Sequence, residues 1–354
     1  MKIMLVSGGT GGHIFPALRL LEEIKKQKIA DVIFITSSRK QNMDILKKEN
    51  IEFSTLPIIG WEHRNILYIL FFILTLILGT MKSFVLLLKF KPDVVMGFGG
   101  YVSGPILFLA ALIKIKTVIH EQNVYPGKTN RILAKVVDKI AVNFPKTLDY
   151  LKGLESKVIV SGNPVRRGLE KTSKSVQPGF RILVVGGSQG SHTLNSLVPR
   201  ALRLIINNGL IVNPVSVIHI SGYKEYADVL GYYNDLTVEH KVFPFTYEID
   251  RFYHECDFVI ARAGATTVTE LLYLGKPAIL VPYPYGDSHQ FYNAEVLKEM
   301  NGAVLLEEKG LSVEVLKDSI LRLMDKDLLQ KMSDSMRNNA IKEPCKILIK
   351  EIVP

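Results

Sequence analysis

Two groups of residues in this sequence have the types and spacing needed to move a proton beside a bound anion. His13 directly follows the glycine loop 8–12, and His120 and Glu121 begin a polar run that ends at Asn123. Histidine can accept a proton near pH 7, and glycines let backbone N–H groups approach a phosphate or a sugar. His13 is therefore a candidate base, with capping of the following helix as its alternative. The alternative for His120 and Glu121 is a structural hydrogen-bonded pair.

The stretch from Ala261 to Asn293 has the pattern of a phosphate-binding unit. It predicts a small-residue turn, a helix, a strand and a polar loop. Gly264 can adopt backbone shapes that other residues resist, and the hydroxyls of Thr266 and Thr267 can satisfy free N–H groups in the first turn. Such a helix start attracts a diphosphate, and Glu270 could accept hydrogen bonds from two sugar hydroxyls. The alternative is an ordinary strand–helix unit whose glycine serves packing.

Strand–glycine loop–helix patterns recur in both halves of the chain. Apolar runs lead into glycine loops at 8–12, 97–105 and 186–190, and each loop precedes a predicted helix, at about 15–26, 106–113 and from 193. Ligands bind at the carboxyl ends of strands in open parallel sheets. We therefore expect the first two glycine loops and residues 120–123 to meet at one edge of a sheet, and Ser188 to donate to a diphosphate.

The predicted fold class is α/β, with two Rossmann-like domains that face each other across a cleft. A chain of 354 residues is long enough for two cores. We expect an N-terminal domain over 1–161, a C-terminal domain over 162–335, and a tail, 336–354, that crosses back onto the first domain. Gly162 and Pro164 suit a crossing between domains, and Arg166 could reach a phosphate or nucleobase.

Several other enzyme classes are not favoured. A dinucleotide site needs an acid at the end of the second strand, but the predicted strand 31–36 ends in Ser37-Ser38-Arg39. The sequence has no P-loop, no serine elbow and no metal cluster, so we expect neither a cofactor nor a metal. With only two cysteines, Cys256 and Cys345, a disulfide framework is not expected, and a reducing compartment is favoured.

Positive charge is concentrated in the first half. Residues 1–161 hold 22 Lys and Arg against 12 Asp and Glu, whereas the net charge of the whole chain is +10. The first domain should therefore attract an anionic surface. A membrane is favoured over nucleic acid, because no nucleic-acid motif and no basic stripe interleaved with aromatic residues is present.

The run from Ile66 to Met81 is apolar on every face of a predicted helix. Its length of about 24 Å falls short of a hydrocarbon core of roughly 30 Å, and the predicted strands on either side belong to one sheet. A peripheral helix that dips into the interface is favoured, with Ile69, Phe72 and Ile73 as membrane contacts. A helix buried in the core and a true membrane span are the alternatives.

Taken together, six motifs resemble those of the MurG family, the N-acetylglucosaminyltransferases of peptidoglycan synthesis in glycosyltransferase family 28. The motifs cover nearly the whole chain, in order: GGTGGHIFPA, GFGGYVSGP, HEQNVYPGKTNR, GNPVR, GGSQG and ARAGATTVTE with GDSHQFYNA. The resemblance implies a GT-B fold and an inverting single displacement that forms a β1,4 link. It implies transfer from UDP-N-acetylglucosamine to the undecaprenyl-diphosphate-linked muramoyl-pentapeptide, converting lipid I to lipid II. The enzyme would act as a peripheral protein on the cytoplasmic face of the membrane.

The same resemblance implies the site residues. Glu270 matches the ribose carboxylate, Gln290 a contact of the donor sugar, and residues 265–269 the helix start around the diphosphate. For the base, His13 is the first choice and Glu121 the second. The residues that match binding positions are Thr10, Gly11, Gly12, Asn123, Asn130, Arg166, Ser188, Asn195, Thr246, Ala265, Thr266, Thr267, Val268, Thr269, Glu270 and Gln290.

The sequence departs from the family pattern at a few positions. Thr246 stands where an apolar residue is expected to contact the base through its backbone, and His289 precedes Gln290 where an amide is common. The alternatives are a glycolipid synthase of the same fold with a diacylglycerol acceptor, and an isomerase similar to UDP-N-acetylglucosamine 2-epimerases. A binding or scaffold protein would need a degenerate site. The polar run 120–123 and the loop 99–101 favour the MurG-like interpretation.

Overall fold

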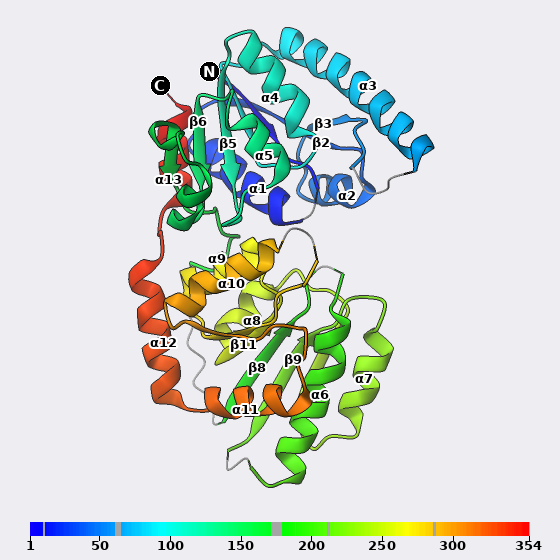
Figure 1. Ribbon diagram of the computed structural model, residues 1–354, viewed down its shortest axis with the longest axis vertical. Helices are drawn as coiled ribbons and strands as arrows, with labels where there is room; N and C mark the ends of the chain where they lie inside the picture. Colours follow the sequence, from blue (N-terminus) through cyan, green and yellow to red (C-terminus); the bar gives the residue numbers. More distant parts are fainter. Residues whose placement is uncertain are drawn as a thin grey trace. The chain divides into compact units, whose positions relative to one another are not determined.

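The chain folds into two compact units, each built on a parallel sheet (Figure 1). The structure is a computed structural model and describes residues 1–9, 11–60, 65–170, 179–187, 189–210, 213–285 and 288–353. The first unit comprises Met1–Val165 and Glu343–Pro354, and the second comprises Arg166–Lys342. The chain thus crosses between units within the segment that contains Gly162 and Pro164.

The tail returns to the first unit later than position 336. Helix α12 (Lys326–Asn339) belongs to the second unit because it packs on α9 (Ala265–Leu274). Helix α13 (Pro344–Ile352) packs on α1 (Gly11–Lys26) in the first unit.

The first sheet has the strand order β3-β2-β1-β4-β5-β6-β7, with every pair parallel. Its central strands are short runs of buried apolar residues because helices cover both faces. The strand order reverses between β1 and β4, which is where ligands bind in such sheets. The strands are β1 (Lys2–Val6), β2 (Asp31–Ser37), β3 (Phe53–Leu56), β4 (Val94–Gly97), β5 (Lys116–Glu121), β6 (Lys139–Val142) and β7 (Val158–Val160).

Two apolar cores fill the space between this sheet and its helices. Helices α1 and α13 contribute Ile14 and Leu348 to one core, and α3, α4 and α5 contribute Leu87, Ile106 and Leu133 to the other. Helix α1 begins before the predicted start at 15, so that Pro16 lies inside the helix. The remaining helices are α2 (Lys40–Lys48), α3 (Ile66–Phe90), α4 (Ser103–Leu112) and α5 (Lys128–Leu133), with 3-10 turns η1 (Pro145–Tyr150) and η2 (Glu155–Lys157).

The second sheet has the order β10-β9-β8-β11-β12-β13 and is also parallel throughout. Its order reverses between β8 and β11. The strands are β8 (Phe180–Val185), β9 (Val215–Ile220), β10 (Glu239–Phe243), β11 (Phe258–Ala261), β12 (Ala278–Leu280) and β13 (Ala303–Leu305). The other helices of this unit are α6 (His192–Asn207), α7 (Tyr226–Asn234), α8 (Ile249–Glu255), α10 (His289–Glu299) and α11 (Val313–Leu323).

Helix α3 is longer than the apolar run that predicted it. It has 25 residues, and at 1.5 Å per residue it is about 37 Å long, so the argument that it is too short to span a membrane is wrong. Figure 1 shows it as a long helix on the outside of the first unit. Only 17% of its most apolar window is buried, so it is not a core helix. The buried face of α3 is a narrow stripe made mostly of small residues, namely Thr75, Gly79, Ser83 and Leu87.

Candidate active site

In the first unit, the glycine loops that follow β1 and β4 pack directly against each other. A Cβ on Gly100 would lie 2.4 Å from the carbonyl oxygen of Gly8, and Gly100 has a φ of +80°. Gly9 and Gly99 also have positive φ, and a Cβ on either would come within about 3 Å of the His13 ring. These glycines are therefore needed to make room for the His13 imidazole between the two loops.

His13 is held through one of its two ring nitrogens. Nδ1 lies 2.9 Å from Oε1 of Gln122, whereas no described residue hydrogen-bonds Nε2. The Gln122 side chain is almost completely buried and follows the end of β5. The sequence assigns Gln122 no role of its own, since a lone glutamine carries no sign of what it will contact.

His120 and Gln122 continue this contact into the interior. Nε2 of Gln122 lies 3.0 Å from both the Phe98 carbonyl oxygen and Nδ1 of His120. Nε2 of His120 lies 2.9 Å from the carbonyl oxygen of Gly162. Burial lowers the pKa of His120 to about 4, so this imidazole is neutral near pH 7. These contacts favour the structural, hydrogen-bonding role for His120.

Glu121 is buried, and its carboxylate organises the loop after β5. Oε1 accepts from the Asn123 backbone N–H at 2.9 Å and from its side-chain amide at 3.1 Å. Oε2 accepts from the Gly127 N–H at 3.0 Å and from the Asn130 amide at 2.8 Å. Four donors on one carboxylate favour a structural role for Glu121. They also place Asn123 and Asn130, whose binding roles stay predictions.

In the second unit, helix α9 begins with an open N-terminus. Its N-cap residue, Gly264, has an ordinary φ of −62°, so the expectation of an unusual backbone shape is wrong. Gly264 has no side chain with which to cap the helix, and its carbonyl oxygen accepts a hydrogen bond from the Val268 N–H at 2.9 Å. Apart from Gly264 and its two chain neighbours, no described residue has an atom within 4 Å of the position that a Cβ on Gly264 would occupy. The fold itself therefore does not demand glycine here.

The predicted ribose carboxylate, Glu270, is buried and forms an ion pair with Arg166. Its Oε1 lies 2.5 Å from Nε of Arg166, and the residue is only 1% exposed. Tyr253 lies beside the pair, and its pKa is raised well above its usual range by burial and by the nearby Glu270 charge. Arg166 and Glu270 thus form one group within the second unit.

Gln290 is oriented by the backbone. Its Oε1 accepts from the N–H groups of Ala263 and Tyr283 at 3.1 and 3.0 Å. The amide nitrogen is therefore the end that remains to donate to a ligand, and no described residue accepts a hydrogen bond from it.

A second cluster links the start of α6 to the end of β11. The guanidinium of Arg262 donates to the Val281 carbonyl at 3.1 Å and forms an ion pair with Glu308, and the hydroxyl of Thr193 donates to Glu308 at 2.6 Å. Burial raises the pKa of Glu308, but these two hydrogen bonds and the positive charge of Arg262 together outweigh that effect, so the pKa lies below its usual value. The sequence motifs do not identify this cluster. The one sign of it in the sequence is an arginine, Arg262, at a position where the strand pattern predicts burial.

Asn195 is buried in an internal network and does not line an open site. Its amide nitrogen donates to the Ser221 carbonyl and to Glu225, and its oxygen lies 3.0 Å from Nε2 of His219.

Among the other predicted residues, Gly11, Gly12 and 265–269 lie at the starts of α1 and α9. Thr10 and Ser188 lie outside the described residues.

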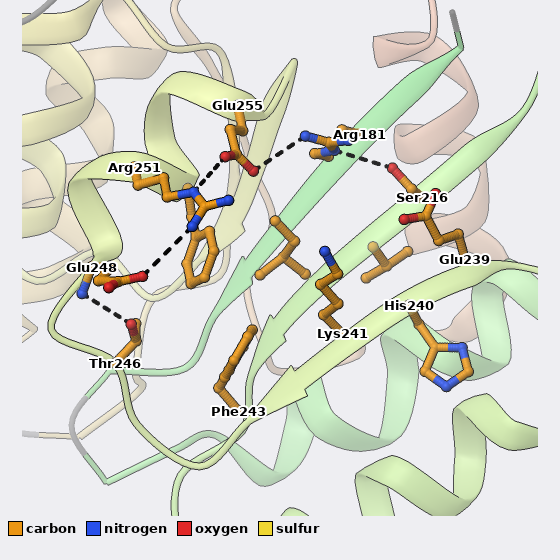
Figure 2. Close-up of a pocket in the computed structure, with 13 residues that line it drawn as sticks. Arg181, Ser216, Glu239, His240, Lys241, Phe243, Thr246, Glu248, Arg251 and Glu255 are labelled. Atoms are coloured by element: carbon orange, nitrogen blue, oxygen red, sulfur yellow. Dashed lines mark hydrogen bonds and ion pairs between the residues drawn. The ribbon is translucent and has the colours of Figure 1, made fainter. Parts of the chain in front are cut away.

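Thr246 points into a cavity on the face of the second sheet (Figure 2). Its hydroxyl accepts from the Glu248 N–H at 3.0 Å. The cavity, of about 290 Å³, contains a chain of ion pairs in which Glu255 bridges Arg251 and Arg181. The Thr246 hydroxyl thus already has a hydrogen-bond partner within the protein. A contact between Thr246 and a nucleobase would therefore depend on the Thr246 backbone.

Comparisons with known proteins identify the family. The model of the glycosyltransferase family 28 N-terminal domain matches residues 3–142, and that of the family 28 C-terminal domain matches residues 181–348. The chain belongs to glycosyltransferase family 28. The predictions of a GT-B glycosyltransferase fold and of a sugar-transferring enzyme are confirmed.

Within this family, the chain belongs to the MurG group. It is 36% identical over 327 residues to the UDP-N-acetylglucosamine–N-acetylmuramyl-(pentapeptide) pyrophosphoryl-undecaprenol N-acetylglucosamine transferase of Desulfotalea psychrophila, covering 91% of this chain and 88% of the relative. It is 35% identical to the protein of the same name from Ruminiclostridium cellulolyticum, covering 100% of both. The crystal structure of Acinetobacter baumannii MurG superposes with a TM-score of 0.80 at 29% identity, covering 99% of this chain and 98% of that one.

Proposed function

We propose that this protein transfers N-acetylglucosamine from UDP-N-acetylglucosamine to the 4-hydroxyl of the lipid-linked muramoyl-pentapeptide, converting lipid I to lipid II. The names of its full-length relatives support this donor and this acceptor. The observation that carries the proposal is the open start of α9 at Gly264, with a buried carboxylate, Glu270, on the same helix.

The donor binds to the second unit. The diphosphate lies at the start of α9, where the helix dipole and the first N–H groups favour negative charge. Space beside Gly264 lets the phosphate oxygens approach the backbone. Glu270 accepts from the ribose hydroxyls, with Arg166 holding its carboxylate, and Gln290 donates its amide N–H groups to a hydroxyl of the sugar.

His13 is the base that the contacts favour. Its Nε2 accepts the proton of the acceptor hydroxyl while the oxygen attacks the anomeric carbon. The new bond joins that oxygen to C1, the bond from C1 to the β-phosphate oxygen breaks, and UDP leaves with the bonding electrons. Attack opposite the leaving group inverts the configuration. Backbone dipoles at α9 stabilise the charge that develops on UDP. Glu121 is the weaker candidate because four donors already occupy its oxygens.

The decisive experiment measures transfer of labelled N-acetylglucosamine from its UDP donor to a lipid I analogue in detergent. We expect labelled lipid and an equal amount of UDP, and we expect His13→Gln to abolish transfer while leaving UDP-N-acetylglucosamine binding intact. Label on diacylglycerol in place of lipid I would make the protein a glycolipid synthase. Conversion of the sugar nucleotide without UDP release would make it an isomerase.

We further infer that the protein binds peripherally to the cytoplasmic face of the cell membrane through α3. The support is the large exposed apolar surface of this helix. Lys82 in its C-terminal half and Lys89 and Lys91 at its C-terminal end are suited to anionic head groups. Strand β1 precedes α3 in the chain and β4 follows it, yet the two strands pair in one sheet, and this argues against a single crossing of the bilayer.

Side-chain exposure along α3 refines which residues would contact lipid. Of the three predicted contacts, Ile73 is exposed, whereas Ile69 and Phe72 are half-buried and Phe72 packs edge-on against Tyr101. The exposed apolar residues of this helix are Ile66, Leu67, Leu70, Phe71, Ile73, Leu74, Ile77, Leu78, Met81, Phe84, Val85 and Leu88.

A further inference from the structure

We propose that Gln122 and His120 form a positioning chain that keeps neutral His13 in the tautomer with the proton on Nδ1, leaving the Nε2 lone pair to accept a proton. The inference rests on the proposed role of His13 as the base. It adds two residues whose contribution is made through His13, without contact with the substrate.

The chain is anchored at a backbone carbonyl. Nε2 of His120 lies 2.9 Å from the oxygen of Gly162, which can only accept a hydrogen bond. Nε2 of His120 therefore carries the proton. Because the imidazole is completely buried and neutral near pH 7, its Nδ1 has a lone pair and must accept.

The amide of Gln122 is oriented by three acceptors. Within 3.2 Å of its Nε2 lie the carbonyl oxygens of Phe98 and His120 and the Nδ1 lone pair of His120. If the amide were turned over, its oxygen would face all three acceptors without a proton between them. The NH₂ group must therefore point into this cluster, and Oε1 must point toward His13.

The orientation of Gln122 fixes the proton on His13. Oε1 of Gln122 can only accept, so the 2.9 Å contact requires a proton on Nδ1 of His13. In the neutral ring, Nε2 is then the basic nitrogen. The imidazole fits closely between Gly9 and Gly99, where an added Cβ would lie only 3.1 or 3.0 Å from the ring, so the ring is also held in orientation.

Few charged groups lie near enough to compete with this arrangement. On the described parts of the three segments around His13, which are 7–12, 97–103 and 119–124, the titratable side chains are Tyr101, His120 and Glu121. Glu121 directs its carboxylate to Asn123, Gly127 and Asn130. The neutral amide of Gln122 is therefore the group that sets the protonation pattern of the ring.

The direct test is the tautomer itself, read by ¹⁵N NMR of the full-length protein labelled at histidine, with the His13 signals assigned by their loss in His13→Gln. Near pH 8 we expect Nδ1 of His13 to be protonated and Nε2 to be unprotonated. The opposite tautomer, or an even mixture, would overturn the proposal. This readout does not depend on activity.

Two substitutions at Gln122 connect the tautomer to catalysis. Gln122→Met removes the acceptor, and we expect a mixed tautomer and a fall in kcat of about tenfold or more, part of the roughly 10²–10⁴ that a general base provides. Donor affinity should change less than about twofold, since the donor site lies in the other unit. Gln122→Glu places a carboxylate on Nδ1–H, which should move the acid limb of the kcat profile upward by about one pH unit.

The matched control is Gln330→Met, which changes an exposed glutamine on α12 whose amide donates to Asp334. It should leave kcat, the pH profile and the tautomer unchanged. A normal tautomer and normal pH profile in both Gln122 variants would overturn the positioning chain while His13 remains the base. Full activity of His13→Gln would instead overturn the role proposed for His13.

Discussion

At the scale of single residues, the Arg166–Glu270 pair explains how the carboxylate that we propose binds the ribose can be buried. A buried charge without a partner is costly, and Arg166 supplies that partner at 2.5 Å. Arg166 also limits the positions that the carboxylate can take. In the role proposed for Glu270, its carboxylate is therefore already held in place for two hydroxyl donors.

Replacing Glu270 with Ala should weaken the binding of UDP-N-acetylglucosamine. Hydrogen bonds to a charged group contribute about 1.5–3 kcal/mol, so the dissociation constant should rise about 10- to 100-fold in calorimetric titration. Glu255→Gln is the control, because Glu255 is also paired with arginines in the second unit but lies in the cavity of Figure 2. Equal donor affinity in Glu270→Ala and wild type would contradict the ribose role.

A second residue-scale prediction concerns pH. Burial lowers the pKa of His219 to about 3, whereas an unfolded histidine has a value of 6.5. Below pH 6.5, His219 therefore binds a proton in the unfolded chain but stays neutral in the folded chain. The free energy of unfolding falls as the pH falls toward 3. At about pH 5.5 this loss amounts to about 1 kcal/mol.

The measurement is urea unfolding of wild type and His219→Gln at about pH 7.5 and 5.5. The variant should be less stable at both values, because Tyr233 and Asn195 lose a partner, but its stability should depend less on pH. An identical pH dependence in the two proteins would show that His219 is not the neutral buried group described here.

At the scale of secondary-structure elements, the start of α9 differs from the tightly packed glycine loops. The turns at Gly8, Gly100 and Gly190 need glycine because backbone or side-chain atoms fill the space that a Cβ would take. Gly264 has an ordinary backbone and open space beside it. A glycine that the fold does not require is better explained by the close approach of a ligand.

Gly264→Ala should therefore separate binding from folding. We expect a loss of stability of no more than about 1 kcal/mol, the cost of a poorer N-cap, but a rise of about tenfold or more in the dissociation constant for UDP-N-acetylglucosamine. Gly231→Ala is the control, because Gly231 also has open space but lies within α7. Wild-type donor affinity in Gly264→Ala would rule out the start of α9 as the diphosphate site.

At the scale of the whole molecule, charge and exposed apolar area coincide in the first unit. The excess of Lys and Arg lies in residues 1–161, and the same unit contains the exposed length of α3. Attraction to anionic lipids and burial of apolar side chains would then act on one part of the protein. The acceptor that we propose is itself anchored in the membrane, so binding there would bring enzyme and acceptor together.

A triple variant in which Leu70, Leu74 and Ile77 are each replaced by serine tests whether α3 binds the membrane. These residues form one stripe at helical spacing, and each is more than half exposed, so the fold should tolerate the change. We expect binding to vesicles that contain phosphatidylglycerol to weaken by about tenfold or more, since each lost contact removes part of the 1.5–3 kcal/mol of a buried side chain. Binding of UDP-N-acetylglucosamine should not change.

The control for this test is the pair Leu210→Ser and Val315→Ser, which removes exposed apolar side chains of the second unit. It should leave vesicle binding at the wild-type level. If the α3 variant binds vesicles as well as the control does, then α3 is not the membrane-binding helix.

The sequence by itself determined the class of fold, the family and most of the loops that form the site. Short buried runs that lead into glycines have few other solutions than parallel strands followed by helices, because only glycine permits the turns at Gly9, Gly99 and Gly187. The motif residues identified the family for the same reason: they stand at fixed places along the chain, where local spacing is enough to identify them.

Only the tertiary structure decided what individual side-chain atoms do. Gln122 contacts His13, which is far from it in sequence, and Arg166 pairs with Glu270 across a similar separation. The tertiary structure also shows that the Glu121 carboxylate accepts hydrogen bonds from four donors and that the Thr246 hydroxyl accepts one from the Glu248 N–H. A donor or acceptor is used or free according to which atoms the fold brings within about 3 Å, and that depends on long-range packing that local spacing does not encode.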